Sequence, residues 1–146
     1  MNVQEKYQRL EDTVRQYNSG ANFDLIHAAF VYAEAHHRGQ NRKDGSPFIT
    51  HPLAVAQIVA QELHLDSESI AAALLHDTIE DTDATHEDIA RTFSPTIADI
   101  VEGVSKLTRV QAASKAEEQM ENLRKMLLAM SKDIRVILIK MADRLH

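Results

Sequence analysis

The sequence contains no cysteine, which excludes disulfide bridges and thiolate metal sites. Its longest uninterrupted aliphatic stretch, Ile70 to Leu75, is far too short to cross a bilayer. The first ten residues lack the basic flank and the apolar stretch of a signal peptide. Together these absences predict a cytoplasmic protein that does not act at a membrane.

An excess of basic residues is also missing, because the 146 residues carry a formal net charge of −6. A chain of this charge is not expected to bind DNA through a basic surface. A small anionic ligand needs only a local cluster of cations or a metal ion, so a nucleotide remains compatible with the charge. The contents of hydrophobic residues (44%) and charged residues (26%) are ordinary, and the length fits a single domain over residues 1–146.

Strict alternation of polar and apolar residues is absent, and no internal repeat is found. Apolar residues recur instead at helical spacing, as in the series Val3, Tyr7, Leu10, Val14 and Tyr17. We therefore predict an all-α fold, a compact bundle of roughly eight helices. The first expected helix ends near residues 18–20, and three others cover residues 23–37, 52–63 and 115–130. A further helix leads to residue 76, and three more start near residues 86, 95 and 131.

Polar residues mark several of the expected helix starts. Thr50 and Ser67 are expected to be N-caps, because a hydroxyl oxygen can accept a hydrogen bond from an unpaired amide of the first turn. Residues 85–88 resemble a capping box, and residues 39–47 read as the one substantial loop. The segment 134–139 is apolar nearly all round, so the last helix is expected to be central.

The segment from His76 to Asp81 combines one imidazole with three carboxylates, directly after the apolar run. Ionised carboxylates in such a place are costly unless they are paired or coordinated, so the segment indicates a cation site. On one continuous helix His76 would stack with Glu80, and Asp77 with Asp81. His76 and Asp77 are then candidates to hold one divalent ion, while Glu80 and Asp81 address a water molecule or a substrate.

Two further candidate ligands lie in distant segments. His51 stands at a helix start beside the polar loop, and Asp143 stands near the end of the last helix, where a buried carboxylate needs a partner. His51 has the alternative of being a cap or a core residue, and Asp143 that of pairing with Arg144 or Lys140. The other histidines are expected to be structural or exposed: His27, His36, His37, His64, His86 and His146.

The order His, His-Asp, Asp on a helical chain resembles the HD-domain phosphohydrolases, a superfamily of divalent-metal enzymes that act on phosphate esters. The sequences of residues 37–52 and 72–82 are similar to those of the hydrolase domain of the Rel/Spo family of alarmone enzymes. Residues 101–108, 121–126 and 133–146 resemble that domain as well.

The resemblance implies hydrolysis of the 3'-pyrophosphate of guanosine tetra- and pentaphosphate, (p)ppGpp, to GDP or GTP and pyrophosphate in the stringent response. It implies Mn²⁺ as the usual ion. By motif matching, the metal would be held by His51, His76, Asp77 and Asp143, and the attacking water would be activated by Glu80 and Asp81.

The resemblance also implies which residues contact the substrate. Arg42 and Lys43 fall where the family contacts the nucleotide, and Lys106 is a further candidate for a phosphate contact. Each has the alternative of being a solvated basic side chain at the surface. Because the motifs of His76–Asp77 and Glu80–Asp81 are intact, the resemblance favours a form that is competent for hydrolysis.

The family continues beyond position 146 with an Asn that helps to contact the nucleotide and with further helices. The chain is therefore expected to be a fragment or a truncated form, with an apolar face around residues 134–141 that invites self-association. Longer family members carry synthetase and regulatory domains. The alternatives are another HD-type nucleotide phosphohydrolase and a truncated domain that binds metal or nucleotide without catalysis.

Overall fold

The computed structural model describes residues 1–110, 124 and 133–146, and these residues form helices and no sheet. The predicted all-α fold is confirmed for this part of the chain. The helix predicted near residues 115–130 lies outside the described residues, apart from position 124. The described helices are α1 (Val3–Tyr17), α2 (Phe23–His36), α3 (Thr50–Leu63), α4 (Ser67–Leu75), α5 (Thr78–Asp81), α6 (His86–Thr92), α7 (Pro95–Val110) and α9 (Ile134–Leu145).

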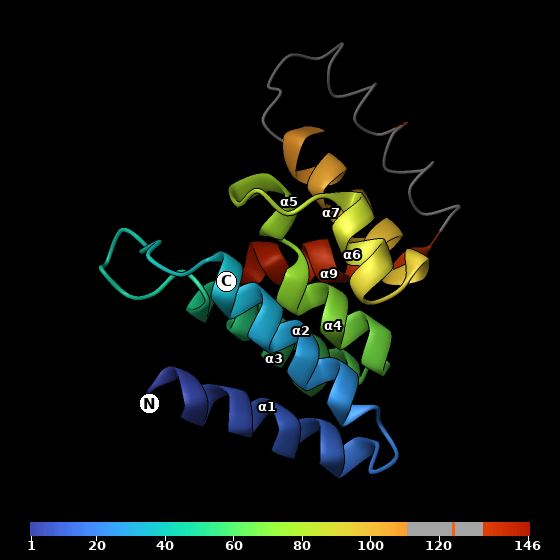
Figure 1. The fold of residues 1–146 in the computed structure, drawn as a ribbon. Coiled ribbons are helices and arrows are strands. Elements are labelled where there is room, and N and C mark those ends of the chain that lie inside the picture. The colour runs from blue at the N-terminus through green and yellow to red at the C-terminus, as the bar shows by residue number, and fades with distance from the viewer. Residues whose placement is uncertain (111–123, 125–132) are drawn as a thin grey trace.

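Helix α4 is the centre of the fold, since every residue from Ser69 to Leu75 is buried. It packs against α2, α3 and α7, while α1 covers α3 and α6 packs on α7 (Figure 1). Helix α9 lies against α3 and α7, so its last turn reaches the loop that follows α2 (Figure 1). Segments that are far apart in the sequence therefore meet at one end of α4.

The periodic reading of α1 is confirmed. Tyr7, Leu10 and Val14 are buried, and the ring of Tyr7 stacks on Phe30 of α2 with 4.4 Å between ring centroids. Burial of three side chains along one stripe explains why a helix with a polar outer face stays attached to α3. Within the described residues no helix is long and apolar enough to cross a membrane.

The N-cap predicted at Thr50 is wrong. Helix α3 begins at Thr50 itself, its N-cap is Ile49, and no side chain caps it. The turn before the helix supplies the acceptors instead, because the amide of Thr50 donates to Pro47 O at 3.1 Å. The hydroxyl of Thr50 also donates to Pro47 O, at 2.7 Å. With its first amide already paired, α3 needs no capping hydroxyl.

The N-cap predicted at Ser67 is wrong by one residue. Asp66 caps α4, and its carboxylate accepts from the amide of Ser69 at 3.1 Å. The hydroxyl oxygen of Ser67 accepts instead from the amide of Asn22, at 2.9 Å, which connects α4 to the start of α2. The capping box predicted at residues 85–88 is confirmed.

Helix α9 buries one face rather than its whole circumference. Val136, Ile139 and Ala142 are buried, but Ile134 is 50% and Met141 57% exposed. The prediction of a central helix is therefore wrong for its outer face. The apolar exposure expected around residues 134–141 is confirmed at these two side chains, and self-association stays a prediction.

Gly103 lets α7 approach α9 closely. A Cβ atom added at this glycine would lie 2.8 Å from Cγ2 of Val136, a buried side chain that is stiff at χ1. We expect Gly103→Ala to lower the free energy of unfolding by about 1–3 kcal/mol through overpacking, less the roughly 1 kcal/mol that alanine gains in a helix. Urea unfolding followed by circular dichroism measures the difference.

Gly20→Ala is the matched control, because a Cβ atom there would meet only Oδ1 of Asn18, at 3.8 Å. This variant should change stability by less than about 0.5 kcal/mol. A Gly103→Ala variant that is more stable than the unsubstituted chain by about 1 kcal/mol, the gain from helix propensity alone, would contradict the close contact with Val136.

Candidate metal centre

The segment predicted as one continuous helix around His76 is broken in the structure. Helix α4 ends at Leu75, and His76 and Asp77 occupy a turn before the short helix α5. The hydroxyl of Thr78 donates to Leu75 O at 2.7 Å and so competes for an acceptor of the helical ladder. The prediction of one continuous helix through this segment is therefore wrong, although His76 and Asp77 keep right-handed helical backbone angles.

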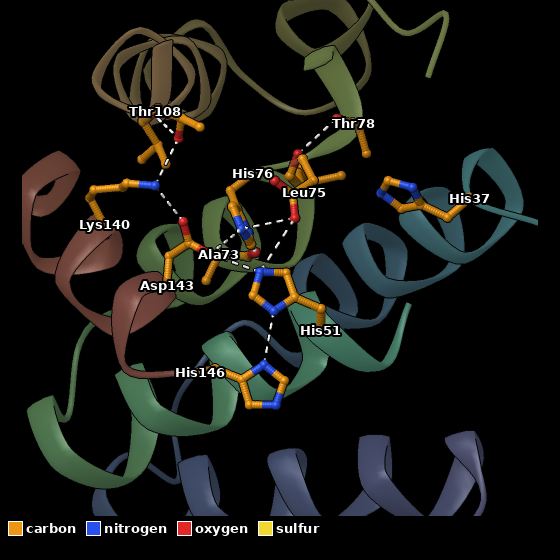
Figure 2. Close-up of polar contacts among 12 residues, drawn as sticks. His37, His51, Ala73, Leu75, His76, Thr78, Thr108, Lys140, Asp143 and His146 are labelled. Atoms are coloured by element: carbon orange, nitrogen blue, oxygen red, sulfur yellow. Dashed lines mark hydrogen bonds and ion pairs between the residues drawn. The ribbon is translucent and has the colours of Figure 1, made fainter. Parts of the chain in front are cut away.

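This turn meets two other helices at the predicted metal-ligating residues (Figure 2). Nε2 of His76 lies 3.0 Å from Oδ2 of Asp77 and 3.4 Å from Oδ1 of Asp143 on α9. Nε2 of His51 on α3 lies 2.7 Å from the same Oδ1 of Asp143 and 3.6 Å from Oδ2 of Asp77. One ligand atom each from His51, His76 and Asp77 fall within 4.8 Å of one another. The structure thus brings all four predicted residues together.

The buried ring of His76 is oriented by the backbone. Its Nδ1 lies 2.6 Å from Ala73 O, and a carbonyl can only accept, so Nδ1 carries a hydrogen. The opposite nitrogen, Nε2, is buried and has no well-directed hydrogen bond within the described part of the chain. A buried nitrogen that faces two carboxylate oxygens is satisfied by a cation between them. The set of imidazole and carboxylate donors suits a divalent ion.

The carboxylate of Asp143 divides its two oxygens between different partners. Oδ1 faces the two histidines, while Oδ2 accepts from Nζ of Lys140 at 2.6 Å. The same ammonium group donates to Oγ1 of Thr108 at 3.0 Å. The alternative that Asp143 pairs with Lys140 is therefore also realised. Lys140 restrains the carboxylate without removing the oxygen that points at the histidines.

The charges of these groups stabilise one another. Burial alone would lower the pKa of His76, but the carboxylates of Asp77 and Asp143 close to its Nε2, together with the hydrogen bond to Ala73 O, raise this pKa to about 10. Burial alone would raise the pKa of Asp143, yet the hydrogen bonds from His51 and Lys140 and the nearby His76 hold it far below its usual range. For Asp77, the effect of burial is likewise outweighed by His76, and the pKa is lowered. Without an ion, the centre is a buried arrangement of imidazolium and carboxylates.

An ion that binds here must displace the proton on His76. We expect about one proton to be released per divalent ion at neutral pH, and the affinity to rise with pH below the pKa of about 10. Calorimetric titration with Mn²⁺ in buffers of different ionisation enthalpy measures the released protons.

His86→Gln is the control for this titration. It removes another pair of histidine and aspartate, His86 and Asp99, whose Nε2 and Oδ1 atoms lie 2.8 Å apart at the surface. The variant should release protons as the unsubstituted chain does. Binding heats that do not depend on the buffer would contradict proton displacement.

Glu80 and Asp81 follow the turn on α5, outside the group of close ligand atoms. Oε1 of Glu80 accepts a hydrogen bond from the hydroxyl of Ser105 on α7. Burial, and next the charge of Asp77, raises the pKa of Asp81. Both carboxylates therefore stand one helical turn from the centre, and Glu80 is fixed by a neighbouring helix. Nothing in the local sequence pattern predicts the contact of Ser105 with Glu80.

The basic residues predicted to contact a substrate differ in their positions. Arg42 reaches from the loop toward His146, with 3.4 Å between a guanidinium nitrogen and Nδ1 of His146. Nδ1 of His146 in turn lies 2.9 Å from Nδ1 of His51. Arg42 is thus at the edge of the centre, whereas Lys43 is an exposed loop residue. His146, expected to be merely structural or exposed, contacts a predicted ligand.

Lys106 does not join the centre. Its ammonium nitrogen lies 3.2 Å from Oε1 of Glu102, one turn away on the same helix, and its side chain is 61% exposed. This geometry is that of a surface ion pair, which contributes little to stability. The alternative reading of Lys106 as a solvated side chain fits this position.

A family model described as an HD domain matches residues 29–146, with the close histidines and aspartates inside the matched range. The chain belongs to the HD-domain family. It is 50% identical over 137 residues to the GTP pyrophosphokinase rsh of Brucella melitensis, covering 94% of this chain and 18% of the relative. It is 48% identical over 140 residues to the bifunctional (p)ppGpp synthase/hydrolase SpoT of Escherichia coli K12, covering 96% of this chain and 20% of that protein.

A solved structure supports the same grouping of this HD domain. It is that of a metazoan SpoT orthologue, described as hydrolysing ppGpp and playing a role in starvation responses. The similarity has a TM-score of 0.61 at 31% identity and covers 83% of this chain and 66% of the other. The resemblance to the Rel/Spo family is confirmed, and the chain spans about a fifth of the curated relatives it matches.

Proposed function

We propose that this HD domain hydrolyses the 3'-pyrophosphate of (p)ppGpp, giving GDP or GTP and pyrophosphate. The observation that carries the proposal is the buried Nε2 of His76, which lies 3.0 Å from Oδ2 of Asp77 and 3.4 Å from Oδ1 of Asp143 but makes no well-directed hydrogen bond among the described residues. Such a nitrogen fits a divalent ion, and the relatives of the chain include a (p)ppGpp synthase/hydrolase.

In this proposal His51, His76, Asp77 and Asp143 hold the ion, which is Mn²⁺. A hard to borderline divalent ion suits two imidazoles and two carboxylates. When bound, it supplies positive charge and Lewis acidity beside a phosphate group. The backbone carbonyl of Ala73 keeps the ring of His76 in place, with 2.6 Å between Nδ1 and the oxygen.

Glu80 and Asp81 then accept the proton of the attacking water. The hydroxyl of Ser105 holds one oxygen of Glu80, so this carboxylate has a defined position relative to the turn. The raised pKa of Asp81, caused by burial and by Asp77, makes its carboxylate a stronger base than an ordinary aspartate. Proton transfer at neutral pH favours such a base.

Arg42 and Lys43 bind the phosphates of the nucleotide. Arg42 stands beside His146 and so beside His51, and a guanidinium group can donate two parallel hydrogen bonds to one phosphate. Lys43 is exposed on the same loop and adds positive charge. Lys106 would have to leave Glu102 to contact a phosphate, which makes it the weakest of the three proposed contacts.

Incubation of the purified chain with Mn²⁺ and guanosine tetraphosphate tests the proposal. We expect GDP and pyrophosphate to form, as measured by ion-exchange chromatography, and formation to stop when EDTA removes the ion. A panel with GTP, GDP and GMP tests the substrate class. Preference for a plain nucleoside phosphate would indicate another HD-type phosphohydrolase, and binding without product would indicate a domain that binds nucleotide without catalysis.

A further inference from the structure

Gln40, in the loop that follows α2, contacts the last residue of α5. Its side-chain Nε2 donates to the backbone oxygen of Asp81 at 2.7 Å, a contact between residues 41 positions apart. Its backbone is held on both sides, because its amide donates to His37 O and its carbonyl accepts from the amide of Phe48, each at 3.0 Å. The side chain of Gln40 therefore reaches α5 from a fixed base.

The partner on α5 is a backbone oxygen that the helix itself leaves unpaired. Helix α5 has only four residues, and Asp81 is its last. The final carbonyls of any helix lack an intrahelical donor, and a single turn forms poorly without outside support. Gln40 supplies a donor at this position and so acts as a C-terminal cap for the segment that carries Glu80 and Asp81.

The orientation of the Gln40 side-chain amide determines which ring nitrogen of His37 carries the hydrogen. Because the oxygen of Asp81 can only accept, the NH₂ group of Gln40 faces it, and Oε1 of Gln40 faces Nδ1 of His37 at 3.2 Å. Nδ1 must therefore donate. Burial lowers the pKa of His37, so the ring is neutral and has this one hydrogen.

The other nitrogen of His37 shows what this ring is used for. The ring is 2% exposed and packs against Phe48, with 4.6 Å between centroids, while Nε2 has no hydrogen-bond partner in the described part of the chain. A buried unpaired nitrogen costs stability that an apolar side chain of similar size would avoid. The directed polar contact of this imidazole among the described residues is the hydrogen bond that Nδ1 donates to Gln40.

We propose that Gln40, oriented by His37, is a positioning residue that fixes Glu80 and Asp81 relative to the loop carrying Arg42 and Lys43. Gln40 lies in this loop, and the bond from the amide of Phe48 to Gln40 O joins the two sides of the loop. The side chain of Gln40 therefore links the loop to α5. This inference rests on the proposed function, in which the loop binds the nucleotide and the carboxylates accept a proton.

Gln40→Glu tests the link at constant size. The substitution keeps an oxygen that accepts from His37, but it replaces the donor to Asp81 O with a carboxylate oxygen that repels it. We expect kcat for guanosine tetraphosphate to fall about 10- to 100-fold, as small misplacements of catalytic groups do, with Mn²⁺ affinity unchanged. We also expect faster hydrogen–deuterium exchange in residues 78–82 of the metal-free chain.

Gln57→Glu is the matched control. It removes a comparable amide donor, because Nε2 of Gln57 donates to Oγ1 of Thr13 at 2.9 Å. This hydrogen bond joins α3 to α1. This variant should keep both kcat and the exchange of residues 78–82. An equal loss in Gln57→Glu would overturn the proposal, because it would show general destabilisation.

Two substitutions of His37 provide the rescue. Asn places an amide NH₂ where Nδ1 of histidine stands, so His37→Asn should retain kcat close to that of the unsubstituted chain. His37→Phe fills the volume without a donor and should behave like Gln40→Glu. Equal activity of the two variants would overturn the role of His37.

The exchange measurement separates this inference from the proposed function. If the unsubstituted chain does not hydrolyse guanosine tetraphosphate, the proposed function fails, and the exchange of residues 78–82 alone decides whether Gln40 holds α5. Unchanged exchange and unchanged kcat in Gln40→Glu would overturn the link.

Discussion

Replacing Asp77 by Asn is expected to lower kcat/KM for guanosine tetraphosphate by about 100-fold or more, because a charged ligand of the ion is lost. Oδ2 of Asp77 lies 3.0 Å from Nε2 of His76 and 3.6 Å from Nε2 of His51, so this one carboxylate faces both imidazoles. Asn preserves the size of the side chain and removes its charge. Initial rates of pyrophosphate release at saturating Mn²⁺ measure the loss.

The same variant should lose the thermal stabilisation that Mn²⁺ confers. An ion present at 100 times its Kd adds about 2.7 kcal/mol to the stability of a protein that binds it only when folded. We expect this rise in Tm in the unsubstituted chain and none in Asp77→Asn at the same concentration. This measurement does not need turnover, so it tests the metal centre independently of the substrate.

Asp99→Asn is the control, because Asp99 also lies beside a histidine, with 2.8 Å between its Oδ1 and Nε2 of His86. The pair joins α6 to α7 at the surface, and neither residue belongs to the group of close ligand atoms. Its loss should leave both the rate and the rise in Tm unchanged. A full rise in Tm in Asp77→Asn would exclude Asp77 as a ligand.

The helices and the four close residues were predictable because their signals are local in the sequence. The stripe of Tyr7, Leu10 and Val14 in α1 has helical spacing, and these side chains are buried as expected. The motif of His76 and Asp77 follows an apolar run, and that run is the buried helix α4. His51 was added because it stands at a helix start beside the polar loop, and Asp143 because a carboxylate near the end of the last helix needs a partner. The structure brings them within 2.7 Å of each other.

The details that decide the geometry of the centre depend on tertiary contacts and had no local signal. At the break after Leu75, the hydroxyl of Thr78 donates to Leu75 O, and such a bond competes with the continuous helix that hydrophobic periodicity favours. Ser105 meets Glu80 only because α7 packs over α5. The bond of Gln40 to Asp81 spans 41 residues, so neither residue type nor spacing indicates it.

The capping errors have the same origin. Ser67 and Thr50 are good capping residues by type, but each hydroxyl is used elsewhere: Ser67 accepts from Asn22, and Thr50 donates to Pro47. Asp66 then caps α4 in place of Ser67. Propensity identifies where a helix starts to within a residue, and the competing tertiary partner decides which side chain caps it.

Replacing Glu80 by Gln should separate ion binding from turnover. We expect kcat to fall about 10²- to 10⁴-fold, the usual contribution of a general base, while the rise in Tm with Mn²⁺ is kept. Gln retains an oxygen that accepts the hydroxyl of Ser105, so the side chain stays in place and only its basicity is lost. Single-turnover rates and thermal melts of the same sample provide the two measurements.

Glu87→Gln serves as the control for the loss of one negative charge, because Glu87 lies in the first turn of α6, outside the centre. Its kcat should equal that of the unsubstituted chain. Loss of the Mn²⁺ effect in Glu80→Gln would make Glu80 a ligand rather than a base, and an unchanged kcat would assign the proton transfer to Asp81. The contrast with Asp77→Asn, which should lose both the ion and turnover, makes holding the ion and activating the water separately measurable.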